Sequence, residues 1–345
     1  MYLSVPTLLL FPPYVCPQQP QALEARLSQK TRLLVFSPHP DDETLGTGGL
    51  MQRVLRMGGS VRVVLLTSGD GYPEGVELEE QISRPTAQDY RAYGELRQEE
   101  AWQVLATLGV KEQDRIFLGF PDGGLCALLR QYRSDGGPAY RSPFTLQDRP
   151  PPTEVIVPDT EYKGEDLKRE LERVLRDFRP TIVVTPHPRD QHPDHCATFF
   201  FVRDALSNLA ASTPPLRPLF LTFLVHFGQW PMSGEAGAGA RLHPPPSFPT
   251  AETQWIVFPL SPAEMATKRR ALLQYRSQML VMGRYLLSFA RANELFLPVQ
   301  EKEEELQVIG CCGQWTDGRG LSLRFPKGKD KRKSALSKRS VRGAR

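Results

Sequence analysis

The sequence predicts an α/β protein of three layers, with a mostly parallel β-sheet between two layers of helices. Short apolar runs rich in Val, Ile and Leu alternate along the chain with longer segments of helical spacing. Such alternation is typical of strand–helix–strand units, in which the strands lie parallel. Two of the apolar runs end in dense clusters of His and Asp. Ligands bind at the carboxyl ends of the strands in sheets of this kind, so the sequence predicts a site at that edge.

The first cluster lies in residues 33–49, which read LLVFSPHPDDETLGTGG. The apolar residues 33–36 predict a buried strand, and the glycines that follow the cluster open a helical pattern. Between strand and helix lie one imidazole and three carboxylates, those of His39, Asp41, Asp42 and Glu43. Histidine and aspartate are ligands suited to zinc, and a tight turn could point His39 and Asp42 at one ion. Alternatively, the carboxylates cap the helix and complement its dipole.

The second cluster, residues 186–195, reads PHPRDQHPDH and follows the β-branched run 182–185. A helix that begins near Pro193 would carry His192 and His195 on one side of its first turn. The chain has six histidines, and four of them lie in the two clusters: His39, His187, His192 and His195. Because both clusters follow apolar strands, we expect them to converge at one site.

The remaining elements follow from apolar periodicity and from glycine and proline stop signals. Further strands are predicted over residues 61–66, 115–118, 181–185 and 219–225. Helices are predicted over 95–108 and 164–178, from the second cluster to 206, and over most of 262–291. The polar residues 72–93 are expected to form a loop over the site, and residues 306–324 have strand-like character.

One domain is expected over residues 31–325, after an extension of residues 1–30 and with excursions near 130–160 and 228–254. The tail, residues 326–345, holds nine Lys or Arg and one Asp. Its net charge is therefore +8 and that of the rest of the chain is −4, so the tail accounts for the basic isoelectric point. A run of this kind is usually disordered, and contact with nucleic acid or an anionic membrane is the alternative.

The composition is that of a globular protein, with 40% hydrophobic and 24% charged residues. No stretch reaches the roughly 18 apolar residues of a membrane span, and the first residues make a poor signal peptide, so a cytoplasmic protein is expected. The five cysteines show neither zinc-ribbon spacing nor a disulfide framework, and Cys196 is predicted to be buried and inert. The GxGxxG spacing of dinucleotide-binding folds and a Walker A sequence are absent.

The two clusters resemble the signature of the LmbE-like, or PIG-L-type, family of metal-dependent deacetylases. PHPDDE and the later HPDH carry the resemblance. Members of that family remove the acetyl group from N-acetylglucosamine-type sugars on various carriers. Weaker matches follow in order at RQEEA (97–101), LGV (108–110), LGFPDG (118–123), Arg179-Pro180, KRRALLQYRSQ (268–278) and ANELF (292–296). The resemblance covers about residues 31–300 and implies a Rossmann-like, three-layer fold.

The resemblance also implies roles for individual residues. His39, Asp42 and His195 would ligate the metal, which leaves a position open for water, as a catalytic zinc site requires. Asp41 would be the general base beside the metal. His192 would stabilise the oxyanion or protonate the leaving amine.

The sequence gives an expectation for four further residues, and two of them have a named alternative. Asp194 would orient or tune a catalytic histidine, or it caps a helix N-terminus. Arg97 and Asp122 resemble positions near the sugar. For Arg97 the alternative is an i,i+3 pair with Glu100 on the helix surface. His187 is extra to the motif and is expected to be solvated.

One position departs from the family pattern. Some relatives have a tyrosine two residues before the first histidine of HPDH, where it assists the oxyanion, whereas this chain has Asp190. An ionised carboxylate cannot donate a hydrogen bond. His226, which follows a predicted strand, is therefore a candidate for that task.

The predicted function is hydrolysis of an N-acetyl amide on a glucosamine-type sugar conjugate, with Zn²⁺ or another divalent metal such as Fe²⁺. A metal-dependent amidase that acts on a thiol conjugate or another non-sugar amide would use the same metal site. A binding module is the alternative from a different class, either a sugar binder without metal or a nucleic-acid binder that uses the tail. The sequence indicates neither the carrier of the sugar nor the oligomeric state.

Overall fold

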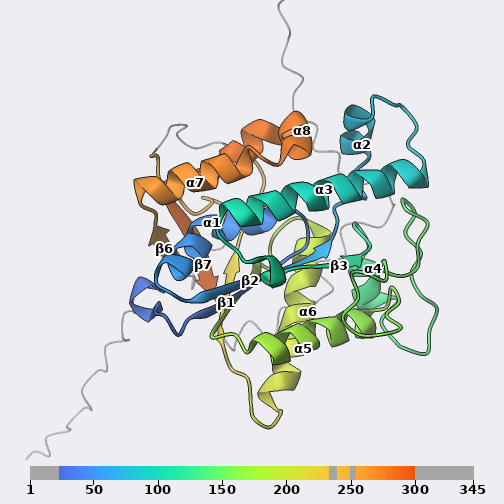
Figure 1. Ribbon diagram of the computed structural model, residues 1–345, viewed down its shortest axis with the longest axis horizontal. Helices are drawn as coiled ribbons and strands as arrows, with labels where there is room; N and C mark the ends of the chain where they lie inside the picture. Colours follow the sequence, from blue (N-terminus) through green and yellow to red (C-terminus); the bar gives the residue numbers. More distant parts are fainter. Residues whose placement is uncertain (1–22, 233–238, 249–253, 300–345) are drawn as a thin grey trace, which may run out of the picture.

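The computed structural model describes residues 23–232, 239–248 and 254–299. These residues form a sheet of seven strands in the order β3-β2-β1-β4-β5-β7-β6 (Figure 1). The first five strands pair in parallel, whereas β7 runs antiparallel to both β5 and β6. The strands are β1 (Arg32–Ser37), β2 (Ser60–Thr67), β3 (Arg115–Phe120), β4 (Ile182–Pro186), β5 (Leu219–Phe223), β6 (Ile256–Pro259) and β7 (Asn293–Pro298).

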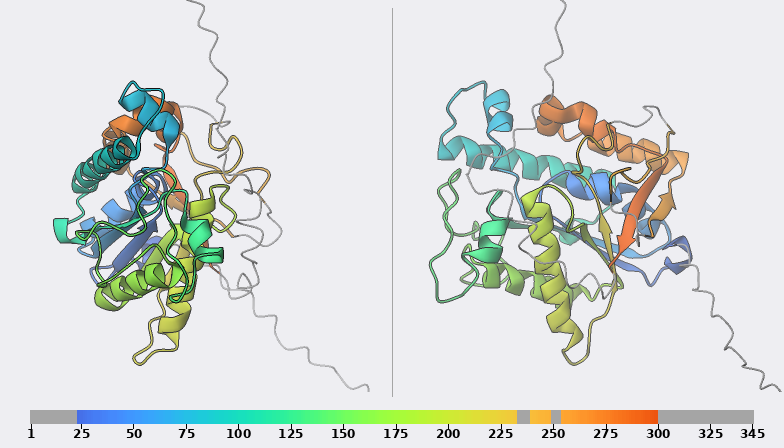
Figure 2. Two further views of the ribbon diagram at one scale, coloured as in Figure 1. Left: turned by 90° about the vertical axis from the view of Figure 1, so that its right-hand side faces the viewer. Right: turned by 180° about the vertical axis from the view of Figure 1, so that it is seen from behind.

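Helices cover both faces of the sheet, which confirms the predicted three-layer α/β fold (Figures 1 and 2). One layer contains α1 (Asp42–Arg56), α3 (Ala87–Thr107), α7 (Pro262–Leu272) and α8 (Arg276–Leu287). The other contains α4 (Leu125–Arg130), α5 (Gly164–Phe178) and α6 (Pro193–Ala210). A short helix, α2 (Pro73–Glu79), packs beside α3 and α8.

The central strands are buried on both faces because successive side chains point to opposite helix layers. In β1, Leu33 and Val35 join the core beneath α1, α3, α7 and α8, whereas Leu34 and Phe36 join the core beneath α4, α5 and α6. All four side chains are fully buried. The apolar run at 33–36 is therefore a strand shared by two cores.

β1 and β4 lie side by side in the sheet, although the chain forms β2 and β3 between them. β1 leads into α1 on one face, and β4 leads into α6 on the other (Figure 2). Loops that diverge to opposite faces mark the topological switch point of the sheet, where ligands bind. The two His/Asp clusters follow these two strands.

Some element predictions are wrong. The expected loop at 72–93 contains α2 and the first turns of α3, which begins with a reciprocal capping box between Thr86 and Asp89. The prediction that 262–291 is largely helical is confirmed, and the segment is divided into two helices because the chain turns between α7 and α8. The sequence does not predict β6 and β7, whose apolar runs are short and whose antiparallel pairing supplies their register.

The expected excursion near 130–160 has neither helix nor strand between α4 and α5. Glu170 of α5 stabilises it, because the carboxylate accepts the backbone N–H groups of Ile156 and Val157. The predicted strand at 306–324, the tail at 326–345 and most of the extension lie outside the described residues. No helix in the described ranges has the length and apolar character needed to cross a bilayer.

Two cysteines fall in the described part of the chain, Cys126 in α4 and Cys196 in α6, and both are disulfide-bonded. Cys196 is buried, as predicted. The cysteine spacing shows no disulfide framework, so the sequence does not indicate these bonds.

Candidate metal centre

The clusters after β1 and β4 meet at the carboxylate of Asp42. Its Oδ2 atom lies 2.9 Å from Nδ1 of His39 and 3.0 Å from Nε2 of His195. The turn between β1 and α1 brings His39 and Asp42 together, since the backbone N–H of His39 also donates to Asp42 Oδ2 at 3.3 Å. His195 lies in the first turn of α6 and reaches Asp42 because β1 and β4 are neighbours. All three side chains are buried.

This donor set fits a divalent metal. Nε2 of His195 is buried and, although it lies 3.0 Å from Asp42 Oδ2, it makes no hydrogen bond among the described residues. Burial lowers the pKa of His195, but the carboxylates of Asp190 and Asp42 outweigh it and raise the pKa to about 9. For the Asp42 carboxyl, burial acts in the opposite direction and raises the pKa. His195 and His39 outweigh this effect and hold the pKa of Asp42 well below its usual range. The same charges that favour a proton between these groups favour a cation there.

The side chains of the cluster form three overlapping sets of potential metal donors. Within each set, ligand atoms lie within 4.8 Å of one another. The sets are His39, His192 and His195; Asp42, His195 and His226; and His39, Asp122 and Asp194. The trio that the resemblance implies combines members of the first two sets.

His39 and His195 each have a second carboxylate at the ring nitrogen that faces away from Asp42. Nε2 of His39 lies 3.0 Å from Asp122 Oδ1, and Nδ1 of His195 lies 3.3 Å from Asp190 Oδ2. Carboxylates in this position fix the orientation of a metal-binding histidine. Asp122 thus lies behind His39 and also accepts the backbone N–H of Gly71 at 2.8 Å.

Asp190 links the loop after β4 to the end of β5. Its Oδ1 accepts the N–H of His192 at 3.0 Å, and its Oδ2 accepts those of Val225 and His226 at 2.8 and 2.9 Å. The side chain is completely buried. The residue that replaces the family tyrosine therefore holds two loops and contacts one candidate ligand.

His192 and His226 extend the cluster to four histidines. The ring centroids of His192 and His39 lie 4.6 Å apart, and those of His226 and His195 lie 4.9 Å apart. Burial lowers the pKa of His192 well below its usual range and that of His226 to about 4. His226 also stacks on Tyr285, whose hydroxyl lies 3.4 Å from His226 Nδ1. Both rings are therefore neutral near pH 7.

Asp41 lies at the N-terminus of α1 with an unusual backbone conformation, φ 117° and ψ −38°. Its side chain makes no capping hydrogen bond, so the capping alternative does not apply to it. One of its carboxylate oxygens lies 3.4 Å from the guanidinium of Arg97. Burial and the neighbouring Asp42 raise the pKa of Asp41 well above its usual range. A buried carboxyl with a raised pKa is suited to accept a proton.

Arg97 projects from α3 into the cluster. Its guanidinium is buried and donates to the carbonyl oxygens of Gly69 and Pro40 at 2.8 and 2.7 Å. The alternative pairing with Glu100 is wrong, because Glu100 accepts the N–H and the hydroxyl of Ser277 instead.

Asp194 connects the cluster to the loop before α4. Its carboxylate accepts the N–H groups of Gly123 and Leu125 at 2.8 and 3.1 Å. Its Oδ2 also lies 3.6 Å from Nε2 of His39. The N-cap of its own helix is His192, so the carboxylate of Asp194 braces α4 rather than α6.

His187 is buried, and the expectation that it is solvated is wrong. Its ring packs against Phe248, and its Nδ1 accepts the N–H of Arg189 at 3.0 Å. Burial lowers its pKa to about 3. The residue lies under the second excursion, which the sequence does not position.

Three groups beside the cluster are absent from the predicted site. Burial and the charge of Asp122 raise the pKa of Asp70, in the loop after β2, to about 8. Glu43 and Tyr275 form a buried hydrogen bond. Asp70 and Glu43 lie after predicted strands, which is a usable signal, whereas nothing in the sequence connects Tyr275 with the site.

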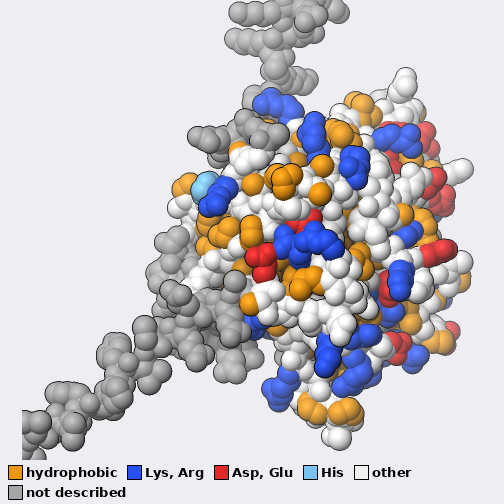
Figure 3. Space-filling view, turned by 60° about the vertical axis from the view of Figure 1, so that its left-hand side comes forward, with side chains coloured by type: hydrophobic (Ala, Val, Ile, Leu, Met, Phe, Trp, Pro, Cys, Tyr) orange, Lys and Arg blue, Asp and Glu red, His pale blue; other side chains and the backbone are white. Residues whose placement is uncertain are grey.

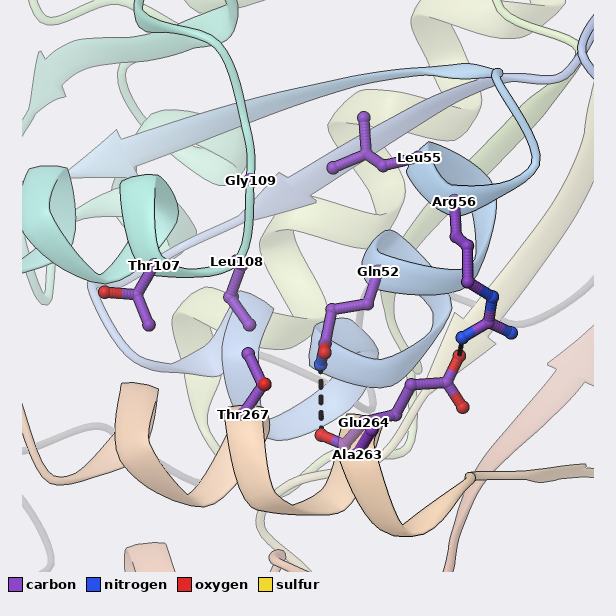
Figure 4. Close-up of a pocket in the computed structure, with 9 residues that line it drawn as sticks. All are labelled: Gln52, Leu55, Arg56, Thr107, Leu108, Gly109, Ala263, Glu264 and Thr267. Atoms are coloured by element: carbon purple, nitrogen blue, oxygen red, sulfur yellow. Dashed lines mark hydrogen bonds and ion pairs between the residues drawn. The ribbon is translucent and has the colours of Figure 1, made fainter.

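A separate groove of about 300 Å³ lies between α1, the end of α3 and the start of α7 (Figure 4). In its wall, Glu264 pairs with Arg56 at 2.8 Å, and Gln52 donates to the backbone carbonyl of Glu264 at 3.1 Å. Gln52 and Arg56 belong to the C-terminal half of α1, whereas the cluster lies at its N-terminus. The groove is therefore not part of the candidate metal centre.

Together, these features define an α/β protein with a buried His/Asp cluster at the switch point of its sheet. The model of the PIG-L family, described as GlcNAc-PI de-N-acetylase, matches residues 34–206, which are half of the chain, and the chain belongs to this family. The family predicted from PHPDDE and HPDH is thus confirmed.

Two curated relatives carry the same name, 1D-myo-inositol 2-acetamido-2-deoxy-α-D-glucopyranoside deacetylase. The one from Mycobacterium sp. (strain KMS) is 34% identical over 169 residues, 48% of this chain and 47% of the relative. The one from Rhodococcus jostii (strain RHA1) is 28% identical over 312 residues, 85% of this chain and 97% of the relative. The matched segment thus spans about half the length of the first relative and nearly all of the second.

Among solved structures, the N,N'-diacetylchitobiose deacetylase from Pyrococcus horikoshii is 18% identical to this chain. The comparison covers 80% of this chain and 86% of that one, with a TM-score of 0.47.

Proposed function

We propose that the protein is a zinc-dependent deacetylase that removes the acetyl group from an N-acetylglucosamine-type sugar conjugate. The observation that carries the proposal is the meeting of His39 and His195 at one oxygen of Asp42, with Asp41 beside them. Three protein donors leave a position open, as catalytic zinc sites require. The names of the relatives, deacetylases of an N-acetylglucosamine–inositol conjugate, support the substrate class.

Zinc held by His39, Asp42 and His195 would supply polarisation of the acetyl carbonyl and a lowered pKa for the attacking water. Asp41 accepts the proton of that water as general base. Water adds to the acetyl carbon, the C–N bond breaks, and the proton taken up by Asp41 balances the protonation of the amine. The products are acetate and a free amino sugar.

For His192, the hydrogen bonding favours the oxyanion role over that of a proton donor to the amine. Its Nδ1 accepts the N–H of Asp194 at 3.2 Å, so the proton of the neutral ring resides on Nε2. Burial and the neighbouring histidines keep the ring neutral. A neutral Nε2–H can stabilise an oxyanion as a hydrogen-bond donor.

For Arg97 and Asp122 we propose that any contact with the sugar is combined with a positioning role. Arg97 lies 3.4 Å from the Asp41 carboxylate, and Asp122 lies 3.0 Å from Nε2 of His39. Both side chains are buried. Arg97 therefore positions Asp41, the proposed general base, and Asp122 positions His39, a proposed metal ligand.

The binding-module alternative has less support. On the face in Figure 3, Lys and Arg side chains are interspersed with acidic and hydrophobic ones, and they do not form a continuous basic surface. A sugar binder without metal would not need carboxylates behind both His39 and His195. The contact of the tail with nucleic acid or a membrane stays a prediction from its charge.

The test is acetate release by the purified protein from 1D-myo-inositol 2-acetamido-2-deoxy-α-D-glucopyranoside, with other N-acetylglucosaminides and an N-acetylated thiol conjugate as comparisons. We expect equal amounts of acetate and free amine from a glucosaminide, loss of activity after chelation, and recovery with added zinc. Release from the thiol conjugate alone would favour the amidase alternative. Acetate release that resists chelation would contradict the proposal.

A further inference from the structure

Asp41 has a backbone conformation that its surroundings must enforce. Its φ of 117° lies in the region that favours glycine. For a residue with a side chain, such a conformation costs free energy and persists only where neighbouring groups over-determine it. The groups that hold this turn therefore also determine where the Asp41 carboxylate points.

Glu43 holds the turn through a hydrogen bond to the backbone of Asp41. Its Oε2 accepts the N–H of Asp41 at 3.0 Å. Its Oε1 accepts the hydroxyl of Thr44 at 2.6 Å and the hydroxyl of Tyr275. Glu43 is completely buried. Because both oxygens accept hydrogen bonds, the carboxylate of Glu43 is fixed in one orientation. Its hydrogen bond to the backbone of Asp41 therefore depends on the donors Thr44 and Tyr275.

Tyr275 comes from a distant part of the chain. It is the N-cap residue of α8, where the chain turns from α7. The side chain is completely buried in the core between the sheet and the helix layer that contains α1. Because neither Tyr275 nor Glu43 is exposed, both can influence a substrate only through the residues they hold.

We propose that Tyr275 and Glu43 are positioning residues that aim the Asp41 carboxylate, an inference that rests on the proposed role of Asp41 as general base. Arg97 also holds this turn, through contacts with the carbonyl oxygen of Pro40 at 2.7 Å and with Asp41 Oδ2 at 3.4 Å. Removal of the Tyr275 hydroxyl leaves Oε1 of Glu43 with Thr44 as its remaining hydroxyl donor, so the carboxylate that holds Asp41 is less firmly oriented.

The network is separate from the contacts among the candidate metal ligands. His39 and Asp42 contact each other at 2.9 Å, and His195 contacts Asp42 at 3.0 Å, without Glu43 or Tyr275. Loss of the Tyr275 hydroxyl is therefore expected to slow turnover while the metal stays bound.

The experiment compares Tyr275→Phe with Tyr162→Phe, each alone and combined with Asp41→Asn. Tyr162 is a matched control, because it is also buried and its hydroxyl donates to the carbonyl of Gly119 at 2.9 Å, in the core on the other face of the sheet. For each variant, kcat and KM for acetate release from 1D-myo-inositol 2-acetamido-2-deoxy-α-D-glucopyranoside, bound zinc and Tm are measured.

Tyr275→Phe is expected to lower kcat by about 10-fold or more, with KM and bound zinc unchanged, because a misplaced base loses rate rather than binding. Tyr162→Phe is expected to keep the wild-type kcat. In the Asp41→Asn background, Tyr275→Phe is expected to have almost no further effect, since it acts through a carboxylate that is already gone. Glu43→Gln, of nearly equal volume, is the second variant and is expected to behave like Tyr275→Phe.

An equal loss of kcat from Tyr275→Phe in both backgrounds would overturn the inference and leave the proposed function intact. Loss of zinc from Tyr275→Phe would overturn it as well. Wild-type turnover by Asp41→Asn would overturn the proposed role of Asp41, and the inference with it.

Discussion

Nε2 of His195 lies 3.0 Å from Oδ2 of Asp42, so an imidazole that follows β4 and a carboxylate that follows β1 meet at one point. The contact exists because β1 and β4 pair in parallel and their connections leave on opposite faces of the sheet. It joins the two sequence clusters into a single buried centre, on which the proposed deacetylase activity depends.

Asp190→Asn is expected to weaken zinc binding by about 10- to 100-fold, because the carboxylate behind His195 is lost while the volume is kept. Chelator competition at fixed pH measures the zinc Kd. Asp177→Asn is the control, since Asp177 forms an exposed pair with Arg173 on α5. A zinc Kd equal to that of the wild type would show that Asp190 only holds the loops together.

His226→Gln is expected to lower kcat by about 10²- to 10³-fold if His226 supplies the oxyanion contact that the family tyrosine makes in some relatives. The ring lies 4.9 Å from that of His195. His187→Gln is the matched control, because His187 is also buried but packs against Phe248. An unchanged kcat for His226→Gln would remove His226 from the mechanism.

Glu264→Gln is expected to lower stability at neutral pH and to reduce the acid sensitivity of the fold. Burial raises the pKa of Glu264, but Arg53 and Ser261 outweigh it and lower the pKa from 4.5 to about 2. A carboxyl with a depressed pKa in the folded state stabilises it above the unfolded pKa, and this contribution is lost as the pH falls toward 2.

Urea unfolding of wild type and Glu264→Gln between pH 7 and pH 2 checks this expectation. The difference in stability should be constant above about pH 5 and shrink below the unfolded pKa near 4.5. Glu99→Gln, on the exposed surface of α3, should show no such trend. A constant difference down to pH 2 would contradict the assignment to the Glu264 carboxylate.

Local patterns predict the elements that carry the centre. Leu33 to Phe36 is apolar enough for a central strand, and HPDH opens a helix at Pro193, as the sequence indicates. The contacts of Asp190 with Val225 and of Tyr275 with Glu43 could not be predicted, because they join segments whose proximity depends on strand order and on helix packing. The same reason applies to β6 and β7, whose pairing is a tertiary contact.

The roles of Asp41 and Asp42 test the central claim most directly, because the two residues are adjacent and chemically identical. Zinc content and acetate release are measured side by side for Asp41→Asn and Asp42→Asn. Asp41→Asn is expected to keep zinc and to lose turnover by about 10²- to 10⁴-fold, since an amide cannot accept the proton of the water. Asp42→Asn is expected to lose zinc, because Asp42 contacts both His39 and His195. Zinc loss from Asp41→Asn with retention by Asp42→Asn would reverse the two roles, and full zinc and full activity in both variants would contradict the enzyme assignment.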